Sequence, residues 1–425
     1  MMGTQRLHGL VARIRRGKAG FILAFSVTWL AVSSVPPAQA QTFTVLYAFN
    51  APPDGDLPLS GVIRDADGNL YGTTYGGGTY GYGTVFKVDT NGTETVLYSF
   101  AGGTDGADPV GGLVRDTGGN LYGATDGGGN ADCGNYGSDC GTIYKVDSNG
   151  NETVLYRFAG LPDGHSADSS LYVADDGSLY GTTEAGGDAA CNPGYGCGTV
   201  FKIDTQGSET ILHTFTGIRE LDGAFPDAGL VADAKGYLYS TTNLGGAPTC
   251  GDAGRPEEVA GCGTVFKIDM QGKETILHRF SAEIGGESPS FPVMFDKAGN
   301  MYSTAGGGNQ YNGVVFELSP RRQERVLYNF SYNQGYPSAG LVRDHKGNLY
   351  STTREGGDYY EGTVYKLDPA GNMTVLHSFS GYSDGGFPDG TLIMDQQGNL
   401  YGTARDGGNH DCGEYGCGVV FKITP

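Results

Sequence analysis

An Asp-Gly pair recurs along the sequence, each time a few residues after an apolar segment that ends in phenylalanine. The aspartates of these pairs are Asp54, Asp105, Asp163, Asp222 and Asp384. Several copies add a second acid shortly afterwards, namely Asp108, Asp168, Asp227 and Asp389. Carboxylates drawn together from several segments could hold Ca²⁺ through oxygen ligands or attract a cationic partner. Asp followed by Gly is also ordinary turn chemistry, in which the carboxylate accepts hydrogen bonds from its own backbone. The turn is the simpler interpretation, and calcium is the one cofactor that these residues leave open.

Tyrosines form a second recurring set, just before segments that read GTVFKVD or a close variant. They are Tyr82, Tyr136, Tyr195, Tyr311, Tyr360 and Tyr415. Amphipathic rings beside carboxylates could stack on the faces of sugars or anchor a peptide. The alternative is that each ring packs within its own hairpin or against the next one. We predict that the paired aspartates and these tyrosines form a binding surface for a glycan, a peptide or an envelope protein.

Catalysis would require residues that break the repetition, because one repeat must supply an acid or a base that the others lack. By position alone, the candidates are Glu184, Glu355, Asp406 and His410. Three other histidines, His213, His278 and His377, replace a recurring tyrosine, which indicates packing. The sequence contains no serine-nucleophile elbow or phosphate-binding loop, and its histidines do not cluster as metal ligands do. We therefore predict no metal site, and keep a hydrolase or lyase acting on polysaccharide or lactone as the alternative function.

The eight cysteines fall into four close pairs: Cys133 with Cys140, Cys191 with Cys197, Cys250 with Cys262, and Cys412 with Cys417. Each pair lies within one glycine-rich connection, so local disulfides are simpler than any exchange of partners. Metal binding would need further ligands at a constant spacing, and the spacings vary. We predict four disulfides, each stabilising a small loop by about 2–3 kcal/mol. Such bridges indicate an oxidising compartment.

The segments that must position these residues occur seven times. Four short apolar segments recur in constant order, typified by GLVRD, LYGTT, GTVFKVD and TVLYSF, with a period of about 55 residues. Each is rich in β-branched and aromatic residues, and turns such as DADGN and DTNGTE separate them. Each is therefore predicted to be a β-strand. We name the four strands A, B, C and D, and the repeating unit is an antiparallel meander.

Seven such sheets, apolar on both faces, predict an all-β fold, a seven-bladed β-propeller of four-stranded antiparallel blades. The first D segment, 44–49, precedes every A segment, and the last C segment, 418–424, has no D segment after it. An N-terminal strand that joins the last blade would close the ring and remove two open sheet edges. The long D–A and B–C connections then share one face, which we call the loop face. The paired aspartates, the six tyrosines and the cysteines all belong to it.

The text GTVFKVDxxGxETVLYSF, then Asp-Gly, then GGLVRDxxGNLYGTT, resembles the GloVer-type exported tandem repeat, a choice-of-anchor tandem repeat family. The resemblance covers residues 42–424. It implies a secreted protein of strand-rich repeats, without an established activity. Many members of that family carry a C-terminal anchor after the repeats, and no such segment follows here, so we do not expect surface retention by that route.

Residues 1–40 are typical of a secretory signal. Basic residues precede a mostly apolar stretch at 19–35, and Ala38-Gln39-Ala40 has the form of a cleavage site. Its removal would leave 41–425 as a single domain, with the net charge changed from −20 to −25 because five basic residues leave. This acidity disfavours nucleic acid and anionic lipid as partners, and no later segment is apolar enough for membrane insertion. We expect an exported, periplasmic or extracellular, non-catalytic binding or scaffold protein.

Overall fold

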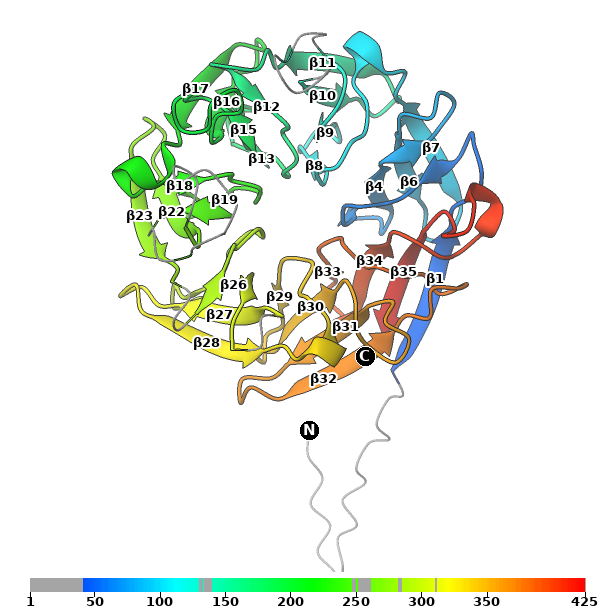
Figure 1. Ribbon diagram of the computed structural model, residues 1–425. Helices are drawn as coiled ribbons and strands as arrows, with labels where there is room; N and C mark the ends of the chain where they lie inside the picture. The colour runs from blue at the N-terminus through cyan, green and yellow to red at the C-terminus, as the bar shows by residue number, and fades with distance from the viewer. Residues whose placement is uncertain are drawn as a thin grey trace, which may run out of the picture. The chain divides into compact units, whose positions relative to one another are not determined.

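The computed structural model describes residues 41–129, 133, 140–246, 250, 261–281, 285–309 and 312–424. Within this part of the chain, seven antiparallel sheets follow one another around a ring (Figure 1). Strand A is innermost and strand D outermost in each sheet, so the molecule is a seven-bladed β-propeller. The predicted fold class is confirmed. No helix among the described residues is long and apolar enough to cross a membrane.

The blades are formed, in strand order A to D, by β3 (Ile63–Arg64), β4 (Leu70–Thr74), β6 (Thr84–Val88) and β7 (Glu94–Ser99); β8 (Val114–Arg115), β9 (Leu121–Thr125), β10 (Thr142–Val146) and β11 (Glu152–Arg157); β13 (Tyr172–Val173), β14 (Leu179–Thr183), β16 (Thr199–Ile203) and β17 (Glu209–Thr214); β19 (Val231–Ala232), β20 (Leu238–Thr242), β22 (Thr264–Ile268) and β23 (Glu274–Arg279); β25 (Met294–Phe295), β26 (Met301–Gly307), β27 (Val314–Leu318) and β28 (Glu324–Asn329); β29 (Val342–Arg343), β30 (Leu349–Thr353), β31 (Thr363–Leu367) and β32 (Met373–Ser378); and β33 (Ile393–Met394), β34 (Leu400–Ala404), β35 (Val419–Thr424) and β1 (Thr42–Ala48).

The N-terminal strand completes the last blade, as the out-of-phase repeats predict. Strand β1 pairs antiparallel with β35, so that Val45 lies opposite Phe421 and Ala48 opposite Val419. Without this pairing, β35 would present a row of unpaired backbone groups at a sheet edge. The two ends of the propeller domain therefore hold the ring shut in one sheet (Figure 1).

Contacts between blades rest on one repeated aromatic pair. The phenylalanine that ends each D segment packs edge-on against the aromatic residue of strand C in the next blade. Phe49 and Phe86, for example, are fully buried, with ring centroids 5.0 Å apart and planes at 74°. Such pairs contribute about 0.5–1.5 kcal/mol beyond the area that they bury. The same contact recurs at all seven junctions and explains why both segments keep an aromatic residue.

Each pairing of strands C and D contains a β-bulge, which the sequence reading missed. In the first blade the register shifts between Val85 and Phe86, which leaves Leu97 of the TVLYSF segment without a partner. Bulges increase the local twist of a strand. The carbonyl oxygen of Leu97 then approaches the next blade at Gly150, where a Cβ would lie 2.8 Å from it. The glycine of each C–D turn is therefore needed for contact between blades as well as for the turn.

The D–A and B–C connections are themselves joined by short strand pairs, which the four-stranded prediction lacks. These are β2 (Gly55–Asp56) with β5 (Gly76–Gly77), β12 (Gly164–His165) with β15 (Ala185–Gly186), β18 (Gly223–Ala224) with β21 (Leu244–Gly245), and β24 (Gly286–Glu287) with the end of β26. The A strands are correspondingly shorter than predicted, two residues each. The residues just before them line an axial cavity, because they lie at the centre of the ring.

Candidate functional site

A cavity of about 280 Å³ opens among the starts of the innermost strands. Its walls come from six of the seven blades, so it lies on the propeller axis. We call it the axial cavity. The polar side chains that line it are Ser60, Ser169, Ser170, Ser290, Thr391, Asp168, Asp227 and Asp389. Glycines such as Gly61 and Gly390 bring the backbone to the same surface.

The residues before each A strand are held in a demanding backbone conformation. Six non-glycine residues there have φ between 50° and 57°: Leu57, Asp108, Ser166, Phe225, Ser288 and Phe387. A left-handed non-glycine residue costs about 1–3 kcal/mol and persists only where its surroundings enforce it. Here the preceding blade does so, because the Asp108 N–H donates to Tyr82 O at 3.0 Å and the Phe387 N–H donates to Glu361 O at 2.8 Å. The acids that follow are therefore placed by a rigid backbone.

Blades 2 to 4 make one side of the axial cavity strongly acidic. Burial raises the pKa of Asp168 well above its usual range, and the nearby carboxylates of Asp126, Glu184 and Asp227 raise it further. Glu184 also has a raised pKa, through burial and then through Asp126. Asn243 Nδ2 donates to Asp227 Oδ2 at 2.9 Å and to Ser290 Oγ at 3.1 Å. Asp168 consequently keeps its proton at a pH where an exposed aspartate is ionised.

Blades 6 and 7 place arginines at the position where blades 2 and 3 have acids. This position directly follows strand B and is occupied by Asp126, Glu184, Arg354 and Arg405 in those four blades. Arg354 Nε lies 3.8 Å from Asp389 Oδ1, and Arg405 makes a two-pronged pair with Asp406 at 2.7 and 3.1 Å. Burial raises the pKa of Asp389 to about 6, although both arginines act to lower it. The cavity thus has an acidic side and an opposite side with paired charges.

The paired aspartates predicted as ligands accept hydrogen bonds within their own loops. Asp54 Oδ2 accepts from the Tyr47 hydroxyl at 2.6 Å and from the Asn50 N–H at 2.8 Å. The same pattern, with a tyrosine or histidine of strand D and a loop N–H, holds for Asp105, Asp163, Asp222 and Asp384. All five lie beside the outermost strand, and none of them lines the axial cavity. Their contacts are those of the turn interpretation.

The predicted tyrosines do not form an even ring. Tyr82, Tyr360 and Tyr415 are exposed, whereas Tyr195 is half-buried near His165, and Tyr136 and Tyr311 lie outside the described residues. Five further exposed tyrosines join the first three, namely Tyr80, Tyr332, Tyr336, Tyr359 and Tyr382. All eight belong to connections of blades 6, 7 and 1, which are consecutive around the ring. We call this set the tyrosine sector.

The four catalytic candidates are separated by the fold. Glu184 lies near the acidic side of the axial cavity, and Asp406 is paired with Arg405 on the opposite side. Glu355 and His410 are exposed residues of the B–C connections and do not line the cavity. The sequence reading did not select Asp126. Its signal was the position after strand B, which varies among charged and polar residues while the LYGTT segment around it stays nearly constant.

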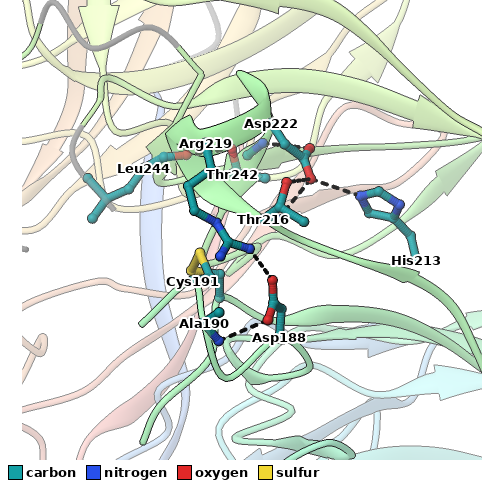
Figure 2. Close-up of a disulfide and its surroundings, with 11 residues drawn as sticks. Asp188, Ala190, Cys191, His213, Thr216, Arg219, Asp222, Thr242 and Leu244 are labelled. Carbon is teal, nitrogen blue, oxygen red and sulfur yellow. Dashed lines mark hydrogen bonds and ion pairs between the residues drawn. A yellow bond between two sulfur atoms is a disulfide. The ribbon is translucent and has the colours of Figure 1, made fainter. Parts of the chain in front are cut away.

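Four disulfides form as predicted, each within one B–C connection. Their Cα–Cα distances lie between 5.2 and 5.9 Å. Figure 2 shows Cys191 of one bridge near the ion pair between Arg219 and Asp188, which joins the D–A connection of blade 4 to the B–C connection of blade 3. The bridges thus stiffen the connections on the loop face, and they fit an oxidising compartment.

Comparison with known proteins identifies the repeat and the architecture. The family model of the Gloeobacter/Verrucomicrobia repeat matches residues 28–253 and 255–425. No curated protein matches the chain. Among solved structures, a putative 6-phosphogluconolactonase from Bacteroides uniformis aligns with TM-score 0.49 and 15% identity over 79% of this chain and 88% of that one. A gluconolactonase from Xanthomonas campestris aligns with TM-score 0.41 and 14% identity, over 90% and 89% respectively. We infer no activity from likenesses of this degree.

Proposed function

This chain belongs to the Gloeobacter/Verrucomicrobia repeat family, and we propose that it is an exported, non-catalytic binding propeller whose loop face binds a neutral glycan. One terminal sugar would enter the axial cavity, and the following sugars would lie across the tyrosine sector. The proposal rests on one observation: eight exposed tyrosines gather on three consecutive blades of the same face as a small polar cavity.

The axial cavity has the chemistry of a sugar subsite. Serine hydroxyls and carboxylates can both accept hydrogen bonds from sugar hydroxyls, and the protonated Asp168 can also donate one. Its volume of about 280 Å³ lies at the small end of ligand pockets, which suits a single ring. The rigid backbone before each A strand holds these groups in place before binding, which reduces the entropy lost on binding.

The tyrosine sector suits the faces of neutral sugars. Tyrosine offers a flat apolar ring and a hydroxyl, and it loses little conformational entropy when it binds. The net charge of −20 for the whole chain disfavours anionic polysaccharides. A neutral chain that stacks on several rings would avoid this repulsion.

A glycan array with purified residues 41–425, followed by calorimetry on the strongest ligand, tests the proposal. Tyr359→Ala, Tyr382→Ala and Tyr415→Ala should each weaken binding by about threefold to tenfold, as expected for one lost aromatic contact. Val375→Ala is the matched control, because Val375 is also exposed but lies on the outermost strand β32. Absence of glycan binding by the parent protein, or equal losses in the control, would refute the proposal.

The raised pKa of Asp168 favours a second candidate function, a hydrolase acting on glycosides or lactones. A carboxylic acid that keeps its proton at neutral pH can protonate a leaving group as a general acid. Chromogenic glycosides and lactones should then be turned over by the parent protein and not by Asp168→Asn. Turnover that survives in Asp168→Asn would exclude this role for Asp168.

A further inference from the structure

A polar junction recurs at the rim of the propeller wherever one blade meets the next. It combines a tyrosine or histidine of strand D, the paired aspartate of the following connection, and the first residue of strand D in the next blade. In three junctions these residues are Tyr47–Asp54–Glu94, Tyr98–Asp105–Glu152 and Tyr156–Asp163–Glu209. Burial, and then the neighbouring aspartate, raises the pKa of each glutamate to about 7. We call these sites rim junctions.

The rim junction between blades 3 and 4 has a histidine in place of the tyrosine. His213 Nε2 lies 3.2 Å from Asp222 Oδ2 and 4.0 Å from Glu274 Oε2. One ligand atom of each residue lies within 4.8 Å of the other two. Figure 2 shows the His213 ring directed at the Asp222 carboxylate. The three side chains are only 20%, 9% and 13% exposed, so they are shielded yet still reach solvent.

The other rim junctions lack part of this donor set. His377 binds Asp384 at 3.0 Å, but Phe43 stacks on its ring where a glutamate would stand. His278 lies 3.0 Å from Glu324, and the described residues of its connection supply no aspartate. The other grouping of such residues in the described chain includes Cys412 and Cys417, which are bonded to each other and offer no thiolate.

We propose that His213, Asp222 and Glu274 form a binding site for a divalent transition-metal ion such as Zn²⁺. One imidazole nitrogen and two carboxylate oxygens are a common set of zinc ligands, and a fourth position would face solvent. Tetrahedral zinc with bonds of about 2.0 Å separates its ligands by about 3.3 Å. The 3.2 Å between His213 and Asp222 fits this spacing, and the 4.0 Å to Glu274 needs only a small rotation.

The surroundings of the site fit a bound cation. The N–H of Thr216 donates to Asp222 Oδ2 at 3.0 Å and the N–H of Gly223 donates to Oδ1 at 2.7 Å, which fixes the carboxylate. Such outer hydrogen bonds orient the ligands of metal sites. Burial, and then Asp222, raises the pKa of Glu274 to about 8, so the two carboxylates repel each other when both are ionised. A dication would remove that repulsion.

The chain supplies its own test variants. His213→Tyr converts the site into the rim junction that occurs three times elsewhere, so the fold should be kept while the nitrogen ligand is lost. Tyr156→His makes the reverse change between blades 2 and 3, where Asp163 and Glu209 are already present. We expect one Zn²⁺ per parent protein by calorimetry, about a hundredfold weaker binding in His213→Tyr, and two Zn²⁺ in Tyr156→His. Co²⁺ should give visible absorption bands in the parent that His213→Tyr lacks.

The comparison uses tag-free residues 41–425, with the thermal midpoint of each variant measured first. If His213→Tyr unfolds, Glu274→Gln replaces it, because that change keeps the shape and removes one charged ligand. Equal Zn²⁺ affinity in the parent and the variant would overturn the proposal, as would an absence of Zn²⁺ binding by the parent. Either result would leave His213 as a simple counter-ion of the two carboxylates.

Discussion

Buried threonine pairs show how single residues stabilise each blade. In five blades a threonine at the end of strand B and one at the start of strand C share a hydrogen bond of 2.8–2.9 Å. Blades 5 and 7 have Ala305 with Val314 and Ala404 with Val419 at the same places. Both polar partners are therefore absent together, as expected when an unpaired buried hydroxyl is costly.

Thr74→Ala should destabilise the protein more than Thr84→Val. Thr74 bonds both Thr84 and the carbonyl of Gly76, so its removal leaves the buried Thr84 hydroxyl without its partner. We expect Thr74→Ala to cost about 1–3 kcal/mol, and the double variant with Thr84→Val to cost less than the sum of the two. Thermal unfolding measures the cycle. Exposed Thr95→Val is the control, and strict additivity would show that the pair has no coupling.

Sequence alone locates some residue roles and misses others, for physical reasons. The disulfides follow from pairs such as Cys191 and Cys197, since partners six residues apart meet in one loop. Asp168 meets Asp126 and Asp227 only because three different blades converge on the axis. The contact of His213 with Glu274 likewise joins adjacent blades, which no local pattern reports. What lies within one repeat could be predicted, and what lies between repeats could not.

At the scale of the strand, the rim glutamates couple the fold to pH. The pKa of Glu94, Glu152 and Glu209 is raised to about 7, mainly by burial, above the value near 4.3 of an exposed glutamate. The folded state therefore binds more protons than the unfolded state between about pH 4 and pH 7. Stability conferred by the protonated form is full at the acidic end of this window and declines as the pH rises to 7.

Asp65 and its equivalents in the A–B turns act in the opposite direction. Burial would raise the pKa of Asp65, but hydrogen bonds from Asn69 and Tyr71 outweigh it and lower the pKa. Stability from these turns is lost as the pH falls below about 4. We therefore expect the thermal midpoint to be highest near pH 5 and lower at pH 8.

Glu94→Gln, Glu152→Gln and Glu209→Gln combined should flatten the decline between pH 5 and pH 8, because neutral amides do not titrate. A scan of thermal midpoint against pH measures both proteins. Exposed Glu355→Gln is the matched control, since it removes a carboxylate without changing a rim junction. An unchanged slope in the triple variant would show that the rim glutamates do not set the pH dependence.

At the scale of the whole molecule, ring closure brings the first repeat next to the last two. The tyrosine sector depends on it, because Tyr80 and Tyr82 come early in the sequence and Tyr382 and Tyr415 late. The sequence predicted this closure from its out-of-phase ends, and the pairing of β1 with β35 confirms it. It did not predict the gathering of tyrosines, which appears only when exposure is known for each ring.

Circular permutation tests whether closure depends on strand pairing alone. Thr42 lies opposite Thr424 at the end of blade 7, much as Thr93 and Asp89 bound the turn between β6 and β7 in blade 1. A three-residue link with the sequence of 90–92 should therefore join Thr424 to Thr42, with new ends opened within 90–92. We expect the permutant to keep the parent's thermal midpoint within a few degrees, because every strand pair remains. Deletion of 41–49 should instead lower it by more than 10 °C, about 3–5 kcal/mol or more, since it removes β1 and the contact of Phe49 with Phe86. A deletion variant as stable as the parent would show that the seventh blade does not need its outer strand.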